Sequence, residues 1–285
     1  MLINNILVLG AKGQLGSEIE AISCDFHQYN FLFTDSFELD ITKHQLVNDY
    51  IELNKINVII NCAAYTNVEK AESEPELADK INHIAVGNLA KTAKKKNIKL
   101  IHISTDYVFD GESQKPYNEL DATNPQTTYG KTKLNGEKAI KKINPLNSVI
   151  IRTSWVYSKY GKNFVKTMLE LAKKNKEISI VSDQMGCPTN AADLAKLILE
   201  IIPKIKNSTV QIYHYSNEGE CSWYDFAKEI FNFTNHCINL KPIDSRSYTP
   251  SVKRPTYSVL SKNKIIKSFD VEVLHWKESF LKFDL

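Results

Sequence analysis

The sequence predicts an α/β fold with a doubly wound parallel sheet and a smaller C-terminal domain. Short apolar, β-rich runs alternate with longer helical patterns through the first half of the chain. Runs that are apolar on both faces and separated by helices are typical of a buried parallel sheet. After about residue 217 the alternation ends, and aromatic and polar segments such as "CSWYDFAKEIFNF" follow. We interpret this last region as a smaller domain or cap on the edge of the sheet.

The expected strands lie at residues 6–10, 29–34, 57–64, 98–105 and 148–154, with two more at 176–182 and 209–216. Between the third and the fourth strand, residues 75–96 repeat apolar side chains every three to four positions, which predicts an amphipathic helix. Pro75 suits the first turn of that helix, because a proline lacks the N–H that would have no partner there.

Composition narrows the class of protein. The 36 basic residues nearly balance the 33 acidic ones, so the net charge of +3 gives no reason to expect nucleic acid as a partner. The apolar runs are shorter than the roughly 20 residues of a membrane span, and the first strand leaves no room for a signal peptide. The seven histidines show no metal-ligand spacing. Scattered cysteines without a CxxC pair favour reduced thiols in a soluble, cytoplasmic protein: Cys24, Cys62, Cys187, Cys221 and Cys237.

The first expected strand runs directly into "GAKGQLGSEI", where Gly10, Gly13 and Gly16 are spaced three apart ahead of a helical run. A glycine-rich turn between a strand and a helix lets the backbone approach a pyrophosphate and presents the helix N–H groups to it. The spacing alone also fits an ordinary turn. Its position after the N-terminal strand, with βα units following, predicts a Rossmann-type domain that binds a dinucleotide.

Asp35 ends the second expected strand, where an acidic residue would bond the 2′-hydroxyl of the adenosine ribose. Ser36 and Phe37 follow it, so no arginine comes next to receive a 2′-phosphate. Because a carboxylate repels that phosphate, we expect NADPH or NADH as cofactor, with a modest preference for NADH. The alternative is that Asp35 only opens a turn.

The fourth expected strand ends in "STDYVFDG", which places Ser104, Thr105 and Asp106 at the carboxyl edge of the sheet, where such folds bind ligands. Tyr129 and Lys133 follow in "TTYGKTKLNGEKAIKK" and share one face of a helix. The pair alone also fits an exposed helical face. A catalytic pair would use the ammonium to lower the pKa of the phenol, while Thr105 shares the charge of a developing alkoxide. Such a set suits the reduction of a ketone.

Six segments together resemble the dTDP-4-dehydrorhamnose reductase family of the extended short-chain dehydrogenase/reductases. They are "GAKGQLG", "NCAAYTNVEKAESEP", "STDYVFDG", "YGKTK", "IIRTSWVY" and "RPTYSVLSKNK". The resemblance implies NAD(P)H-dependent reduction of the C4 keto group of dTDP-4-dehydro-β-L-rhamnose to dTDP-β-L-rhamnose. Two alternatives stay open, a reductase of another nucleotide-linked 4-keto-6-deoxy sugar and a non-catalytic, cofactor-binding regulatory subunit on the same fold.

The resemblance also implies roles for single residues. Tyr129 would be the proton donor and Lys133 its partner, and Thr105 would assist catalysis with Asp106 beside it at the sugar. Trp155 would contact the substrate, unless it is a core aromatic. Besides Tyr129 and Lys133, the cofactor contacts are expected from Gly10, Gly13, Gln14, Leu15, Gly16, Asp35, Asp40, Ile41, Ala64, Tyr65 and Thr66.

Arg254 would reach the nucleotide diphosphate, because a guanidinium fork matches phosphate oxygens, unless it has only a surface role. Glu69 and Glu72 are expected to make helix-start or sugar-hydroxyl contacts. Some family members dimerise through carboxylates bridged by Mg²⁺; Glu18 matches one such position, but Ala192 stands where another carboxylate is expected, with Asp193 one place along. This departure counts against Mg²⁺ and predicts no metal site. A monomer and a homodimer both fit the sequence.

The expected division of the chain follows from these assignments. Residues 1–154 and about 176–216 would form the dinucleotide-binding Rossmann domain. Residues of about 155–175 and 217–285 would form the domain that binds the dTDP-linked 4-keto-6-deoxy sugar.

Overall fold

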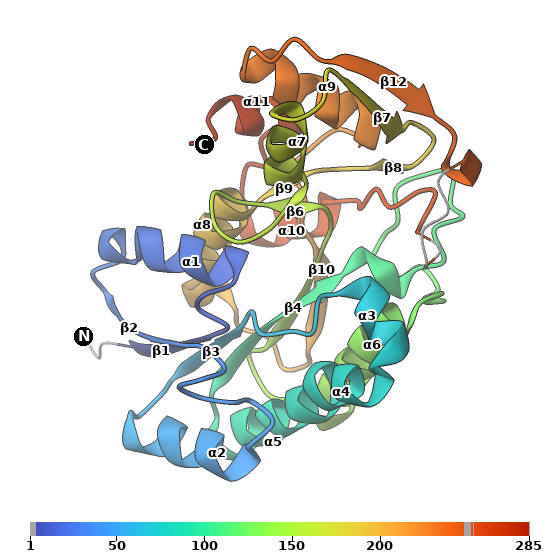
Figure 1. Cartoon of the computed structure of the whole chain (residues 1–285). Coiled ribbons are helices and arrows are strands. Elements are labelled where there is room, and N and C mark those ends of the chain that lie inside the picture. Colours follow the sequence, from blue (N-terminus) through green and yellow to red (C-terminus); the bar gives the residue numbers. More distant parts are fainter. Residues whose placement is uncertain (1–3, 248–251, 253, 285) are drawn as a thin grey trace.

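The computed structural model describes residues 4–247, 252 and 254–284. Its centre is a six-stranded parallel sheet in the order β10-β5-β4-β3-β1-β2 (Figure 1). The strands are β1 (Asn4–Leu9), β2 (Tyr29–Thr34), β3 (Val58–Asn61), β4 (Lys99–Thr105), β5 (Val149–Thr153) and β10 (Gln211–His214). Each overlaps a run that the sequence predicts as a strand, and the predicted α/β fold is confirmed.

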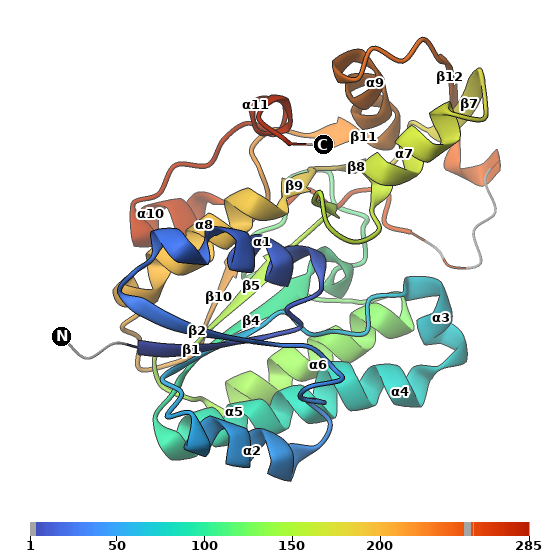
Figure 2. The ribbon, with the colours of Figure 1, turned by 60° about the vertical axis from the view of Figure 1, so that its left-hand side comes forward.

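Alternate side chains of these strands enter two different hydrophobic cores, which explains why the runs are apolar throughout. Ile6 and Val8 of β1 pack in one core, and Leu7 and Leu9 pack in the other. Helices α1 (Gln14–Ile22), α8 (Ala191–Ile201) and α10 (Asn263–Phe269) cover the first face. Helices α2 (His44–Leu53), α5 (Val86–Lys96) and α6 (Thr128–Ile143) cover the second, as Figure 2 shows from the side.

The helix predicted over residues 75–96 is present but not uniform. It begins at its proline as α4 (Pro75–Asp79), passes through a π-helical turn, η2 (Lys80–Ala85), and continues as α5. The short helix α3 (Val68–Ser73) precedes it. The π turn covers only six residues, too few for apolar periodicity to reveal it, and such turns often lie at functional sites.

A third hydrophobic core lies in the C-terminal part, which sits above the carboxyl edge of the sheet (Figure 2). Helices α7 (Phe164–Ala172), α9 (Trp223–Phe233) and α11 (Trp276–Leu281) enclose it. Two short strand pairs join it to the sheet, β6 (Val156–Tyr157) with β9 (Thr189–Asn190), and β8 (Met185–Gly186) with β11 (Cys221–Ser222). Short 3-10 turns complete the elements: η1 (Ser23–Asp25), η3 (Asp106–Val108), η4 (Ile202–Lys204) and η5 (Ser245–Ser247).

The strand predicted at residues 176–182 exists as β7 (Glu177–Val181), but it does not join the six-stranded sheet. It pairs with β12 (Asn239–Ile243), and its Ile178 and Ile180 pack in the C-terminal core. An apolar run predicts a strand without predicting its neighbour, because pairing partners can come from anywhere in the chain. The division into domains stays a prediction, and this packing favours assigning residues 177–181 to the second domain.

The position of β1 fixes where a ligand would bind. The chain passes from β1 to β2 on one side and then returns to β3 on the other. In doubly wound sheets, ligands bind at the carboxyl ends of the strands beside such a reversal. Among the described residues, none of the helices is long and apolar enough to cross a membrane.

Candidate active site

A cleft of about 820 Å³ opens at the carboxyl edge of the sheet, over the ends of β1, β3 and β4. Nearly all of the residues that the sequence assigns to the site line this cleft. They are Gly10, Gly13, Gln14, Leu15, Gly16, Asp35, Asp40, Ile41, Ala64, Tyr65, Thr66, Thr105, Asp106, Tyr129, Lys133 and Trp155. Arg254 lines an adjoining hollow of about 180 Å³, together with Asp106 and Trp155.

The glycine turn between β1 and α1 has the geometry of a phosphate cradle. Gly10 adopts a left-handed backbone with φ of 78°, and a Cβ on Gly16 would lie 2.4 Å from the Gly10 carbonyl oxygen. The turn therefore packs too closely for side chains. Helix α1 starts at Gly13 without a side-chain cap, which leaves its first N–H groups available to an anion. These residues fit the diphosphate of a dinucleotide.

Asp35 lies at one end of the cleft, where it opens a turn and also pairs with a lysine. Its Oδ1 accepts hydrogen bonds from the N–H groups of Phe37 and Glu38, at 2.8 and 3.2 Å, so it does open a turn. Its Oδ2 forms an ion pair with Lys12 of the glycine turn, and this contact is the largest cause of its lowered pKa. Asp35 therefore presents a charged carboxylate to the cleft, with a lysine beside it.

The segment after β3 is held in place by the π-helical turn. Asn82 accepts a hydrogen bond from Tyr65 N at 2.9 Å, and it donates to Tyr65 O at 3.0 Å and to Thr132 Oγ1 at 3.2 Å. The Tyr65 phenol donates to Glu74 at 2.6 Å. Asn82 lies in the π turn and thus connects the segment that lines the cleft to helix α6. This contact gives the π turn a structural role.

Thr105, Tyr129 and Lys133 meet at the other end of the cleft. Thr105 is the last residue of β4, and α6 carries the other two on one face, with Thr127 capping its first turn. The Thr105 hydroxyl donates a hydrogen bond to Asp106 Oδ1 at 2.9 Å, and the same side chain lies close enough to the Tyr129 phenol to act on its pKa. The exposed-face alternative does not fit Lys133, because only 2% of that residue is exposed.

The ionisation of this pair differs from the prediction. Burial raises the pKa of Tyr129 to about 12, more than the Thr105 hydrogen bond lowers it. Lys133 Nζ instead donates to the Ile103 carbonyl at 2.5 Å, and burial lowers the pKa of Lys133 to about 8. The prediction that Lys133 lowers the pKa of the phenol is therefore wrong for this geometry. Tyr129 holds its proton at neutral pH, as an acid must before it donates.

Asp106 stands where the cleft meets the hollow. It is 4% exposed, and burial raises the pKa of its carboxyl to about 7. Thr105 accepts a hydrogen bond from Tyr107 N at 3.2 Å, which holds the turn after β4 in place. The Asp106 carboxyl therefore gains or loses its proton near neutral pH, at the point where the cleft meets the hollow.

Trp155 and Trp223 form one wall of the hollow. Their rings stack with centroids 3.4 Å apart and planes at 8°, and Trp155 has a left-handed backbone with φ of 49°. A Cβ on Gly186 would lie 2.4 Å from the Trp155 indole, so glycine is required beneath it. The indole lines both the cleft and the hollow, and it also packs against the C-terminal hydrophobic core.

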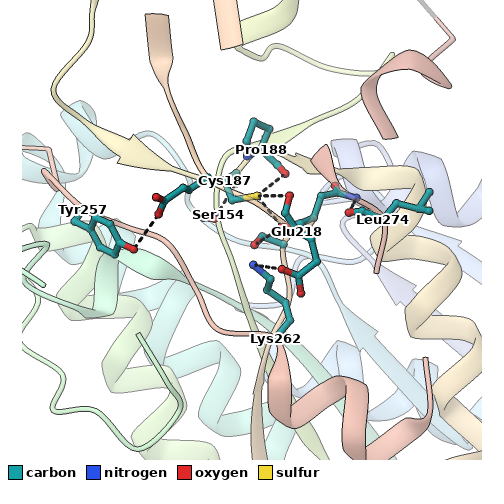
Figure 3. A network of polar contacts seen from close by, with 10 residues as sticks. Ser154, Cys187, Pro188, Glu218, Tyr257, Lys262 and Leu274 are labelled. Carbon is teal, nitrogen blue, oxygen red and sulfur yellow. Dashed lines mark hydrogen bonds and ion pairs between the residues drawn. The ribbon is translucent and has the colours of Figure 1, made fainter. Parts of the chain in front are cut away.

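A polar network fixes Ser154, the residue before Trp155, and Figure 3 shows this network around Ser154, Cys187 and Glu218. The Ser154 hydroxyl donates to the Cys187 carbonyl at 3.2 Å, and the Cys187 thiol donates to the Asn217 carbonyl at 2.7 Å. Next to it, Lys262 is 4% exposed and lies 3.4 Å from Glu218. Burial raises the pKa of Cys187 to about 12, so this thiol supports the wall and does not act as a nucleophile.

Arg254 lines the hollow and pairs with helix α3. Its Nη2 lies 2.8 Å from Glu69 Oε1 on α3, which lowers the pKa of Glu69. Glu72 makes the helix-start contact, because its carboxylate accepts hydrogen bonds from Thr128 N and Thr128 Oγ1 at 2.7 and 2.6 Å. The sequence left the choice between helix-start and sugar contacts open for both glutamates.

The two carboxylates considered for a metal bridge have protein partners. Glu18 is 4% exposed and accepts a hydrogen bond from Ser158 at 2.6 Å. Asp193 accepts from Asn217 at 2.7 Å and from Ser279 at 2.5 Å. Within the described residues, no three histidine, cysteine or acidic side chains gather as metal ligands. A magnesium bridge gains no support from these positions.

The fold and the site together define a Rossmann-fold oxidoreductase of the short-chain dehydrogenase/reductase class. The family model described as "RmlD substrate binding domain" matches residues 4–283. The chain belongs to the dTDP-4-dehydrorhamnose reductase family.

Known relatives agree over nearly the whole length. A dTDP-4-dehydrorhamnose reductase from Aggregatibacter actinomycetemcomitans is 40% identical, covering 96% of each chain. The crystal structure of dTDP-4-dehydrorhamnose reductase from Bacillus anthracis in complex with NADP is 38% identical, with a TM-score of 0.93 and 99% of each chain covered. A dTDP-4-keto-6-deoxy-D-glucose reductase from Streptomyces niveus is 32% identical, covering 95% of this chain and 93% of the relative.

Three residues of the site escaped the sequence reasoning. Lys12 sits inside the glycine turn, where its charge next to a phosphate site was a usable signal. Trp223 lies in a segment noted only for its aromatic content. His102 lies two residues before Ser104 on β4 and therefore shares a strand face with it, but the histidines were noted only for their lack of metal-ligand spacing.

Proposed function

We propose that this protein reduces the C4 keto group of dTDP-4-dehydro-β-L-rhamnose to dTDP-β-L-rhamnose with NADPH or NADH. One observation carries the proposal: Thr105, Tyr129 and Lys133 meet at one end of a cleft whose other end is the glycine turn. That arrangement suits a dinucleotide that lies along the cleft with its reactive ring beside a proton donor. The similarity to named reductases supports the choice of substrate.

The residues of the cleft would hold the cofactor in sections. Gly13, Gln14 and Leu15 would contact the diphosphate, Asp40 and Ile41 the adenine side, and Ala64, Tyr65 and Thr66 the path to the nicotinamide. When bound, the reduced nicotinamide supplies the hydride for the sugar C4. Lys133 would also donate a hydrogen bond to the nicotinamide ribose.

The protein itself supplies the proton. Thr105 and Tyr129 would donate hydrogen bonds to the carbonyl oxygen and so polarise the C4 keto group. Tyr129 then transfers its O–H proton to the oxygen as negative charge develops there. The phenolate that remains regains a proton from water before the next turnover.

The sugar nucleotide would extend from this centre into the hollow. Trp155 offers an apolar face to the deoxysugar, Asp106 lies beside it, and Arg254 would contact the diphosphate. For Arg254 this requires that its pairing with Glu69 gives way to, or is shared with, the phosphate oxygens.

NADH is the proposed preference, by a modest margin. The lowered pKa of Asp35 keeps a carboxylate where the ribose hydroxyls of NADH would donate hydrogen bonds to it and a 2′-phosphate would be repelled. Lys12 opposes this preference for NADH. Its ammonium pairs with Asp35 and its side chain is mostly exposed, so the ammonium can move to contact the 2′-phosphate of NADPH. The two side chains together support the use of both cofactors.

A second candidate is a reductase of a related 4-keto-6-deoxy sugar, with a talose- or fucose-type product. The similarity to the enzyme from Streptomyces niveus favours keeping it, since the two substrates differ only in sugar configuration. A non-catalytic regulatory subunit has less support, because a binding module has no need of Thr105, Tyr129 and Lys133 together. The scattered free cysteines support a cytoplasmic location for the protein.

Purified protein should be assayed with dTDP-4-dehydrorhamnose and either NADH or NADPH, and the product configuration determined by NMR. The proposal expects dTDP-β-L-rhamnose with both cofactors, faster with NADH. A talose- or fucose-type product would favour the second candidate. Cofactor binding without turnover of any such sugar would favour the regulatory subunit.

A further inference from the structure

Behind Tyr129, the side chain of Lys133 ends in a closed polar site. Lys133 Nζ donates to the Ile103 carbonyl and lies 3.4 Å from His102 Nε2. His102 is fully buried and lies on β4, next to the strand end that carries Thr105. The other ionisable groups that act on Lys133 are Cys62 after β3 and Glu137 on α6, while Tyr129 lies one turn away on the same helix.

The hydrogen-bond partners of Asn61 determine which ring nitrogen of His102 carries the hydrogen. Asn61 Oδ1 accepts a hydrogen bond from Ala63 N at 3.2 Å, so its Nδ2 is the atom that faces His102 Nδ1, at 3.1 Å. An amide NH₂ can only donate, and His102 Nδ1 must therefore accept. A neutral imidazole has one N–H, which then lies on Nε2.

His102 is neutral, because burial together with the Lys133 charge lowers its pKa well below the ordinary value. Its Nε2–H points at Lys133 Nζ. An ammonium has three donors and no acceptor, so the charged lysine would face this N–H as a second donor. A neutral amine has a lone pair that can accept it. The contact therefore favours the neutral form of Lys133.

Glu137 favours the charged form of Lys133 and so raises its pKa, but it is not a direct hydrogen-bond partner of the Lys133 amine. Its carboxylate accepts hydrogen bonds from Ser104 Oγ at 2.5 Å and from Arg152 at 2.9 and 2.7 Å. Burial lowers the pKa of Lys133 to about 8, and Glu137 and Cys62 oppose that change. His102 is thus the neighbour that adds to the effect of burial through a direct contact.

We propose that Asn61 fixes the tautomer of His102, and that His102 in turn favours the neutral amine of Lys133, so that both act as positioning residues for the proton-transfer centre. The proposal rests on the proposed function for its catalytic meaning, since Lys133 acts there beside Tyr129. Its structural content, a tautomer and a protonation equilibrium, does not depend on the substrate.

The tautomer can be measured without turnover. In protein labelled with ¹⁵N-histidine, two-bond ¹H–¹⁵N spectra distinguish the protonated from the unprotonated ring nitrogen, and the His102→Gln variant identifies the signal. We expect Nε2–H for His102 in the unaltered protein. In Asn61→Asp, a carboxylate would accept from the ring, and the hydrogen should move to Nδ1. His102 with its hydrogen on Nδ1 in the unaltered protein would overturn the proposal.

The protonation of Lys133 gives the second readout. With Nδ1–H in Asn61→Asp, His102 Nε2 becomes an acceptor for the ammonium, and the new carboxylate adds a favourable charge. The titration of Lys133, followed by NMR of ¹³Cε-labelled lysine, should then move up by about one pH unit or more. Asn30→Asp, an exposed change of equal charge on β2, should leave it in place. An unchanged titration in Asn61→Asp would contradict the proposal.

Turnover tests the catalytic meaning. Because the ammonium is present below about pH 8 and lost above it, kcat/KM should fall above about pH 8 in the unaltered enzyme. In Asn61→Asp the alkaline fall should move upward with the lysine titration. If Asn61→Asp does not fold, His102→Phe serves as the second variant. It removes the imidazole N–H that disfavours the ammonium of Lys133, so the alkaline fall in kcat/KM should also move to higher pH. The expected tautomer and titration without any turnover would reject the proposed substrate and leave this inference standing.

Discussion

Glu137 and Arg152 form a buried, doubly hydrogen-bonded ion pair beneath the catalytic end of the cleft. Arg152 Nε and Nη2 lie 2.9 and 2.7 Å from the two oxygens of Glu137, and the side chains are 2% and 3% exposed. Ser104, next to Thr105, donates to the same carboxylate at 2.5 Å. The pair thus connects α6, β5 and the end of β4, which are the elements that position Lys133 and Thr105.

Breaking this pair should destabilise the protein strongly. Glu137→Gln leaves a buried guanidinium without its countercharge, and the free energy of unfolding should fall by about 3–5 kcal/mol. Urea denaturation measures the change. Replacing both residues by methionine should cost much less, because no buried charge then remains. If the single change cost as little as the double one, the pair would not have the role given to it.

Cofactor choice should depend on Lys12 and Asp35 in opposite directions. Lys12→Ala removes the cation that can reach a 2′-phosphate, so the affinity for NADP⁺ should fall by about fivefold while that for NAD⁺ changes little. Asp35→Asn should shift the preference toward NADP⁺. Isothermal calorimetry measures both, with Lys162→Ala, a lysine that also lines the cleft, as the control that should weaken both cofactors alike. Equal losses for both cofactors in Lys12→Ala would reject the assignment.

Asp106 should make the folded protein less stable as the pH rises from about 4 to neutrality. Its pKa is raised by burial to about 7 from an ordinary 3.8, so the folded state keeps a proton that the unfolded state has lost. Stability should therefore fall between pH 4 and pH 7, by up to about 1.4 kcal/mol per pH unit from this group.

Asp106→Asn removes that dependence. Urea denaturation at pH 5 and pH 8 should show a smaller loss of stability in the variant than in the unaltered protein. An identical pH dependence of the two proteins would mean that Asp106 is ionised in the folded state throughout this range.

Gly186 should be needed for the sugar site and not for the cofactor. In Gly186→Ala the new Cβ would meet the Trp155 indole at 2.4 Å and displace it, so the KM for the sugar nucleotide should rise by about tenfold. The Kd of the cofactor should stay unchanged in a fluorescence titration. Gly87→Ala is the matched control, because its Cβ would meet Ala139 at an ordinary 3.5 Å inside a helix. An unchanged KM in Gly186→Ala would exclude Trp155 from the substrate wall.

The sequence predicts the strands of the sheet better than it predicts the contacts between distant elements around the site. Buried strands and a glycine turn leave local signals, so β1 to β5 and the phosphate cradle follow from apolar runs and spacing. The pairing of β7 with β12 joins segments about sixty residues apart, and no local pattern encodes it. The same holds for the Trp155–Trp223 stack and for the partners of Arg254, which come from distant elements.

The ionisation of Tyr129 and Lys133 was misjudged for a related physical reason. Spacing on a helix gives the distance between two side chains but not their burial or their other partners. The Ile103 carbonyl and the His102 ring bind the lysine from β4, and burial then sets the pKa of both groups. The residues of the catalytic pair could be predicted, while their protonation required the tertiary structure.

Replacing Tyr129 by phenylalanine tests the central claim most directly. Single-turnover reduction of dTDP-4-dehydrorhamnose should slow by about 10²- to 10⁴-fold, with the Kd of the cofactor unchanged. Tyr213→Phe, which removes the phenol oxygen of a tyrosine on β10 outside the cleft, should reduce at the normal rate. A Tyr129→Phe protein that reduces the sugar within a few-fold of the normal rate would show that another group donates the proton.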